Sequence, residues 1–407
     1  MNEYERNIVK DYRRNVTAIF FFEFFWGFGM PFTTFITMAP AFLLTLGASK
    51  TLIGLVQAFF TLTAPMQLLS IGIIRGEHRI SSLFTLFFTA IALWFLYALL
   101  SLLFIPSTSN VLLMVLFLPV LLVFSGFLNI GNPIYFSILT DIVPKYKRGR
   151  LFGLRTFAMG ISGAVVSLGA YTLLSRYTHP VNYQLSFIIG TSLWLIACIS
   201  IFFIKDHRRI KTTQRKRGDY NSLKRQFVII WQNPNQRIFL FFYLLTLITT
   251  MFGGFIIPFS QESFNLSAAD ISRFSLIYLA CISFMGVMVG KLADRFGYKM
   301  VHVLQCVCLI LCFVLVLYAP NKYFLFIAYA FYSIPLVSNL FLLTNLSVEF
   351  NPHLDGGVLS AISNTLVLPL VVTVSLLAGF FIDMSGGYKE IFLIGIAISS
   401  VALIGLI

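Results

Sequence analysis

Charged residues are scarce in this sequence, and so are long polar stretches. Only 11% of the 407 residues are charged and 58% are hydrophobic, whereas a soluble domain carries roughly a quarter charged residues. A water-soluble chain of this composition would expose large apolar patches and aggregate. Runs that alternate apolar and polar residues with period two are also missing, so strands are not expected. The composition therefore excludes an ordinary soluble domain and favours lipid as the solvent.

Cysteine and histidine are few, with five of each. His302 and Cys306 have a spacing that can hold a metal on one face of a helix. Four clean ligands are missing, however, and all five cysteines lie in apolar stretches, which favours small buried hydrophobic side chains. The histidines are scattered, and no glycine-rich phosphate loop is present. We therefore expect no metal, no cofactor and no ATP hydrolysis, and a membrane-embedded enzyme is disfavoured.

Long apolar stretches are abundant. About twelve of them are long enough to cross a hydrocarbon core of about 30 Å. The first is expected to remain a helix instead of a signal peptide, because residues 1–16 are polar and the stretch is too long and carries Glu23. The sequence therefore predicts an all-α polytopic membrane protein with twelve transmembrane helices. The stretches lie near 17–43, 51–74, 80–104, 110–139, 151–175, 185–205, 238–259, 268–290, 299–319, 323–346, 357–382 and 389–407.

Basic residues are distributed unevenly between the two faces of this predicted bundle. The net charge is +14, and if the N-terminus is cytoplasmic, all but five of the 29 Lys and Arg residues fall on the cytoplasmic side. This asymmetry follows the positive-inside rule, and it predicts a cell membrane protein (plasma or inner membrane) with both termini cytoplasmic. Topology and contact with anionic lipid headgroups explain the charge, so nucleic acid is not an expected partner.

The chain divides into two halves that resemble each other. A polar, basic segment over 205–237 separates six apolar stretches in 1–204 from six in 238–407. The segment "DIVPKYKRGRLFG", which begins at Asp141, aligns with "EFNPHLDGGVLSA", which begins at Glu349. An acid, a proline and a glycine match in register, which indicates an internal repeat. Two pseudosymmetric six-helix bundles with a cytoplasmic linker are typical of transporters, with the substrate site between the bundles.

The segment "GKLADRFGYK" over 290–299 joins the eighth and ninth stretches. It resembles the loop signature of the major facilitator superfamily, and the span count, the linker and the repeat extend that resemblance over the whole chain. The resemblance implies a monomeric secondary transporter of a small organic solute, working by alternating access. The loop between the second and third stretches, "GIIRGEHRI", departs from the signature because it has lost the acid-then-basic pair.

Two alternatives remain open at this stage. A drug or metabolite efflux antiporter of the same superfamily is the first. It is weakened because the Gly-Pro signature on the fifth helix and the arginine on the fourth helix of such antiporters are missing. A receptor or scaffold that transports nothing is the second.

The resemblance also implies a set of gating residues. In the family, the acid that corresponds to Asp294 caps the N-terminus of a helix in the opposite half, and a helix dipole stabilises such an anion. Here the expected target is the fifth helix, starting near 149–151, and Gly297 is expected to adopt a positive φ. The alternative is a solvated turn whose charges fix only the topology. The set comprises Gly290, Asp294, Arg295, Gly297, Lys299, Asp141, Arg148, Gly149, Arg150 and Glu349.

Glu23 is the one acid expected deep inside the bundle. It lies about two turns into the first apolar stretch, among aromatic residues, and an acid at such a depth is a functional hypothesis by default. A desolvated carboxyl group suits proton coupling. Arg155, one turn inside the fifth helix, is the expected partner. Coupling or substrate contact, a structural ion pair, and an acid near the interface without a special role are the three interpretations.

Polar side chains on the helices that line the cavity in this superfamily are candidate substrate ligands. As a set, the amides, hydroxyls and aromatic rings favour a mostly neutral, hydroxylated or mixed polar solute. The alternative for each residue is a hydrogen bond between helices, which is common in membrane proteins. The candidates are Trp26, Thr33, Asn129, Asn132, Tyr135, Thr249, Thr250, Tyr332, Asn339 and Asn364.

Overall fold

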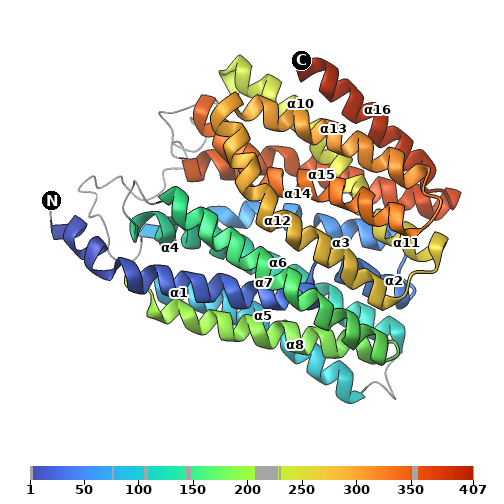
Figure 1. The fold of residues 1–407 in the computed structure, drawn as a ribbon, viewed down its shortest axis with the longest axis horizontal. Helices are drawn as coiled ribbons and strands as arrows, with labels where there is room; N and C mark the ends of the chain where they lie inside the picture. The colour runs from blue at the N-terminus through green and yellow to red at the C-terminus, as the bar shows by residue number, and fades with distance from the viewer. Residues whose placement is uncertain are drawn as a thin grey trace.

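The computed structural model describes residues 3–75, 78–104, 109–143, 148–206, 228, 231–350 and 356–406, and the regular elements in these ranges are all helical. The predicted linker over 205–237 therefore falls largely outside the described residues. In Figure 1 the N-terminal helices, blue to green, lie below the C-terminal helices, yellow to red.

Helices make up both parts of the chain, before and after the linker. Before the linker the elements are α1 (Glu3–Thr33), α2 (Met38–Thr45), α3 (Lys50–Leu62), η1 (Ala64–Leu69), α4 (Ser70–Arg75), α5 (Arg79–Phe104), α6 (Asn110–Asp141), α7 (Arg148–Arg176), α8 (Val181–Ile199) and η4 (Ser200–Phe203). After it they are α10 (Pro234–Gly253), α11 (Ile256–Phe264), α12 (Ala268–Phe296), α13 (Tyr298–Leu317), α14 (Lys322–Phe350), α15 (Gly356–Ser385) and α16 (Lys389–Leu406).

Ten helical segments among the described residues are long and apolar enough to cross a membrane. They coincide with ten of the twelve predicted stretches. The two remaining stretches, 323–346 and 357–382, coincide with α14 and α15, which have 29 and 30 residues. The all-α class is confirmed, and the predicted count of twelve is consistent with these elements.

Polar residues at the helix ends explain where several helices begin. Ser49 and Ser109 accept hydrogen bonds from the first turns of α3 and α6. Asn233 caps α10 just before Pro234, a residue favoured in the first turn. Ser267 forms a capping box with Asp270 at the start of α12. Each cap satisfies N–H groups that a helix leaves unpaired.

Three predicted stretches that were expected to be continuous are broken. The first divides into α1 and α2, and the Thr34 carbonyl accepts N–H bonds from residues 37–39 at the break. The second divides at η1, where Pro65 supplies no N–H group. The seventh divides between α10 and α11 before Pro258. Pro258 lies in the first turn of α11, where its missing N–H group breaks no bond within the helix.

Two antiparallel helix pairs join the parts before and after the linker, hereafter the N half and the C half. α7 packs against α12, and α3 packs against α15. We call the side with the start of α1 and the end of α14 the linker side. The side with the connections 46–49, 265–267 and 386–388 is the far side.

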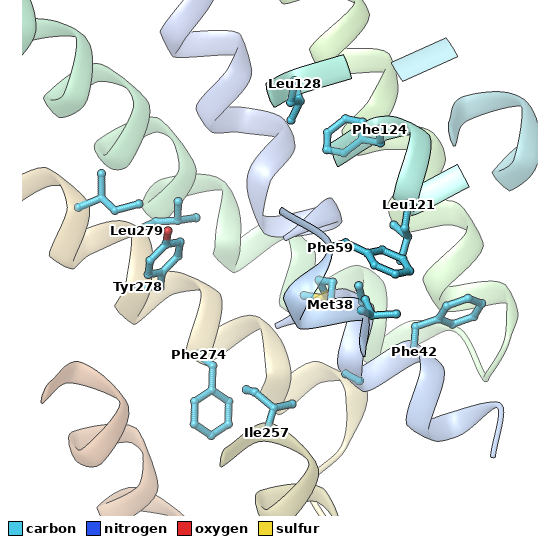
Figure 2. Close-up of a cluster of buried hydrophobic side chains, with 14 of the residues drawn as sticks. Met38, Phe42, Phe59, Leu121, Phe124, Leu128, Ile257, Phe274, Tyr278 and Leu279 are labelled. Carbon is cyan, nitrogen blue, oxygen red and sulfur yellow. The ribbon is translucent and has the colours of Figure 1, made fainter. Parts of the chain in front are cut away.

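One large buried cluster crosses from the N half into the C half. It includes Met38, Phe42 and Phe59 from the N half and Phe274 and Tyr278 from α12. Figure 2 shows part of this cluster with residues from both halves. In a bilayer, helices associate through van der Waals packing and hydrogen bonds between them, so the halves are held together here by packing as well as by polar contacts.

Candidate functional site

A buried ion pair lies where α1, α6 and α7 meet. Glu23 on α1 is 1% exposed, and Arg155 on α7 donates from Nε to Glu23 Oε1 at 2.5 Å. The Tyr135 hydroxyl on α6 donates to the same oxygen at 2.8 Å. The sequence predicted the partners of this pair, and Tyr135, predicted as a substrate ligand, is its third member.

Aromatic rings surround this pair. The Arg155 guanidinium lies 5.2 Å from the Tyr135 ring centroid and 5.1 Å from that of Phe136, within cation–π range. Phe22 packs on Tyr135 with centroids 5.1 Å apart. Apolar surroundings strengthen electrostatic interactions and make an unpaired charge costly. Glu23 and Arg155 therefore depend on each other for charge compensation.

The predicted gating turn has the expected backbone. α12 ends at Phe296, α13 begins at Tyr298, and Gly297 between them has φ of 79°. Arg295 and Lys299 are exposed beside it. α7 begins at Arg148, close to the predicted start. The side chains of Asp294, Arg148, Arg150 and Glu349, and the surroundings of Gly149 and Gly290, lie outside what the structure describes, so the pairing of Asp294 with α7 stays a prediction.

Asp141, also predicted as a gating residue, belongs to a charged cluster on the linker side of the N half. Arg79 at the start of α5 is 3% exposed, and its Nη1 donates to Asp141 Oδ2 at 2.8 Å. The same guanidinium forms a bidentate pair with Asp206, which follows η4. Arg79 and Asp206 were not predicted as site residues, because their partners lie on distant elements.

Asn129, a predicted substrate ligand, stabilises the break in the second stretch. Its Nδ2 donates to the Phe60 carbonyl at 2.8 Å and to Thr63 Oγ1 at 2.7 Å. Its Oδ1 accepts from Gln67 Nε2 at 2.9 Å. α3 ends at Leu62, so the amide supplies a donor to a carbonyl in the last turn before the break.

Five other substrate candidates form hydrogen bonds either within their own helix or to a neighbouring helix. Thr33, Thr249 and Thr250 donate to carbonyls of their own helices. Tyr332 donates to the Thr250 carbonyl at 2.8 Å, and Asn339 accepts from a glutamine of α13 at 2.9 Å. These contacts fit the alternative interpretation of bonds within and between helices.

Three substrate candidates remain. Trp26 is half-buried and stacks on Trp194 with centroids 4.7 Å apart, while its carbonyl accepts the Trp194 indole N–H. Asn132 is half-buried on α6. Asn364 lies outside the described side chains.

His302, considered for a metal site in the sequence, is buried beside α10. Its Nε2 lies 3.0 Å from Thr246 Oγ1, and Cys306 is buried one turn further along α13. Among the residues that the structure describes, no three His, Cys, Asp or Glu side chains come together as metal ligands. A hydrogen bond to a hydroxyl group accounts for the buried imidazole.

Comparison with known proteins gives a family match. A family model described as Major Facilitator Superfamily matches residues 17–368. No curated protein matches the chain.

Solved structures with the same fold include several transporters. The nucleoside transporter NupG is 15% identical, with a TM-score of 0.69, and the alignment covers 96% of this chain and 98% of that one. A POT family transporter in complex with a thioalcohol conjugated peptide is 10% identical, with a TM-score of 0.69 and coverage of 97% and 94%. The Escherichia coli fucose:proton symporter FucP is 14% identical, with a TM-score of 0.59 and coverage of 96% and 97%. At these identities the similarity concerns the fold.

Proposed function

Because the chain belongs to the major facilitator superfamily, and is therefore a multi-pass membrane transporter and not an enzyme, we propose that it is a proton-coupled secondary transporter of a small organic solute. The N half (1–204) and the C half (238–407) rock about a shared central site and expose it alternately to the two sides of the membrane. The linker (205–237) and both termini face the cytoplasm. The protein works as a monomer in the cell membrane, among lipids whose anionic headgroups contact its basic cytoplasmic face.

The buried Glu23–Arg155–Tyr135 cluster carries the coupling part of this proposal. With Glu23 ionised, Arg155 and Tyr135 are both held on its Oε1 atom. A proton on Glu23 removes the charge that holds Arg155, and the guanidinium is then released toward another acceptor. Because the cluster joins α1, α6 and α7, its rearrangement is transmitted to α7, which packs against α12 of the other half. Proton binding at Glu23 thereby shifts the equilibrium between the two relative orientations of the halves.

Amide, hydroxyl and aromatic groups support a mostly neutral, hydroxylated solute. Trp26 and Asn132 are half-buried near the cluster in sequence, and the nucleoside transporter and the fucose:proton symporter share the fold. We propose that the residues that bind the solute are the ten candidates expected from the sequence. Asn129 and Asn339 act within it only if their present amide partners release them.

On the linker side, the turn around Gly297 closes the cytoplasmic entrance in the outward-facing state. In that state Asp294 caps the start of α7 beside Arg148 and Arg150, and the pseudosymmetric acids Asp141 and Glu349 hold the ends of α6 and α14. Arg295 and Lys299, which are exposed here, are available to pair when the halves close.

A transport assay with a substrate panel tests the function. The purified protein is reconstituted in liposomes, and uptake of labelled nucleosides, monosaccharides and dipeptides is measured with and without an inward proton gradient. We expect one class to accumulate when the gradient is applied. If the gradient drives only the outward movement of a compound, the efflux antiporter is the better interpretation. If no compound moves or binds, the transport proposal fails.

The variant Glu23→Gln tests the coupling. It keeps the size of the side chain and removes the titratable group. We expect gradient-driven uptake to be lost while exchange of solute between the two compartments persists. The control is Glu390→Gln, which removes an exposed carboxylate on the far side. Unchanged gradient dependence in Glu23→Gln would rule out the coupling role.

A further inference from the structure

Asp383, near the C-terminal end of α15 in the C half, caps a helix of the N half. Its Oδ1 accepts from the Lys50 backbone N–H at 2.8 Å, and its Oδ2 accepts from the Thr51 N–H at 2.8 Å. The Thr51 hydroxyl donates to Oδ2 at 2.6 Å. One carboxylate thus receives three hydrogen bonds from the first turn of α3.

The N-terminus of α3 leaves two donors for this carboxylate. Ser49 already accepts from the Leu52 N–H at 3.2 Å, so the N–H groups of Lys50 and Thr51 are those that the helix itself does not satisfy. The positive end of the helix dipole favours an anion at this place. The cap of α3 is therefore complete only when the C half is in contact with it.

A second charged contact lies beside the first. The Lys50 ammonium pairs with Glu262 of α11, and the Tyr388 hydroxyl donates to Glu262 Oε2 at 2.8 Å. Burial, and the hydrogen bond to Glu262, raise the pKa of Tyr388, so the phenol remains a donor. Lys50 therefore engages the C half twice, through its backbone and through its side chain.

Glycines permit the close approach that this cap needs. A Cβ atom on Gly379 of α15 would clash with the Lys50 carbonyl oxygen, and a Cβ atom on Gly54 of α3 would clash with the Ser375 carbonyl oxygen. Gly379 lies one turn before Asp383. The two backbones can thus meet only because neither glycine carries a side chain at the crossing.

We propose that Asp383, with Lys50, Thr51, Glu262 and Tyr388, forms a clasp that holds the far side closed. This inference rests on the proposed alternating access and adds the residues that set its equilibrium. When the far side opens, α3 moves away from α15, and the Lys50 and Thr51 N–H groups and the Lys50 ammonium pass to water. Solute then enters or leaves on that side.

The strength of the clasp sets how often the far side opens. Hydrogen bonds to a charged acceptor are stronger than neutral ones, and three of them reach Asp383. Removing the negative charge is expected to raise the ratio of open to closed far side by about tenfold or more. Salt weakens the clasp as well, because these groups are partly exposed.

Distance measurements between spin labels test the clasp without a substrate. Labels are attached at Val111→Cys on α6 and Tyr323→Cys on α14, two exposed far-side positions in different halves. The five native cysteines are replaced by serine. We expect one short distance in the parent protein and an added longer component in Asp383→Asn. Thr51→Val, which removes only the hydroxyl bond, is expected to shift the distribution less in the same direction.

The control and the contrary outcomes separate this proposal from the transport proposal. The control variant, Glu390→Gln, removes another far-side carboxylate of the C half, which lies beside Gly387 of the same half. The distances between the spin labels in this variant should match those in the parent protein. If folded Asp383→Asn and Thr51→Val both match the parent too, the clasp is wrong, even if transport is found. If their distances lengthen while no solute is transported, the clasp stands and the transport proposal fails.

Discussion

At the scale of single residues, the interior is organised by the few charges that enter it. Glu23 and Arg155 satisfy each other, with Tyr135 as the third group. Arg79 is similarly enclosed between Asp141 and Asp206. Because a buried charge without a partner is expensive, each of these groups depends on a residue far away in the sequence.

A double variant at Glu23 and Arg155 should show this dependence. Arg155→Gln leaves Glu23 as a buried carboxylate without its cation, and we expect a loss of about 3–5 kcal/mol in stability. Adding Glu23→Gln removes the stranded charge and should recover most of that loss. Thermal unfolding in detergent measures both variants. Equal instability of the single and the double variant would show that packing, and not charge, dominates here.

The charged pair was predictable and the amide roles were not. Glu23 and Arg155 stand out because an apolar stretch contains almost no other charges, so each has few possible partners. Asn129 looks in the sequence like a cavity residue, but in the structure its amide bonds Phe60, Thr63 and Gln67. That role exists only because the helix next to it is broken, which no local pattern at Asn129 reveals.

At the scale of elements, helix length was easier to predict than helix continuity. The bilayer imposes a length of about 20 residues on every crossing helix, so apolar stretches mark most helix ends to within a few residues. The exception is α1, which begins at Glu3, well before the predicted start near 17. The breaks at η1 and at 254–255 receive donors from other helices. Gln57, for example, donates to the Gly254 carbonyl at 2.8 Å across the halves, and such a contact is invisible in a linear sequence.

The turn between α12 and α13 gives a prediction at this scale. A Cβ atom on Gly297 would meet no neighbouring atom, yet φ is 79° and ψ is 164°. In this backbone region, which is nearly exclusive to glycine, another residue costs about 1–3 kcal/mol. Gly297→Ala should therefore lower stability by that amount through the backbone alone, as measured by thermal unfolding in detergent.

Gly153 supplies the matched control for that experiment. A Cβ atom there also meets no neighbour, but the residue lies inside α7, where alanine is preferred over glycine by about 0.5–1 kcal/mol. Gly153→Ala should be neutral or slightly stabilising. If both variants lose the same stability, the positive φ of Gly297 is not the cause.

At the scale of the whole molecule, the two halves meet through contacts that join distant parts of the chain. Lys50 and Asp383 are 333 residues apart and Thr37 and Ser275 are 238 apart. The internal repeat predicted that two similar bundles would face each other, because each must bury one face. It did not predict which residues would meet, since that choice depends on how far the bundles are rotated.

The contact between Thr37 and Ser275 allows a direct test of rocking between the halves. Their hydroxyl oxygens lie 2.6 Å apart on the far side, one between α1 and α2 and the other on α12. The double variant Thr37→Cys/Ser275→Cys should therefore form a disulfide on oxidation. That bond fixes the far side closed, so we expect both net uptake and exchange to stop, and a reducing agent to restore them.

A second cysteine pair separates loss of rocking from damage by oxidation. The hydroxyl oxygens of Thr63 and Ser125 are 3.4 Å apart, and both residues belong to the N half. A disulfide between cysteines at these positions crosses no moving interface if each half moves as a unit. Transport by the oxidised control should then persist at the level of its reduced form. Undiminished transport by fully cross-linked Thr37→Cys/Ser275→Cys would mean that the halves do not separate here, and alternating access would require motion within a half instead.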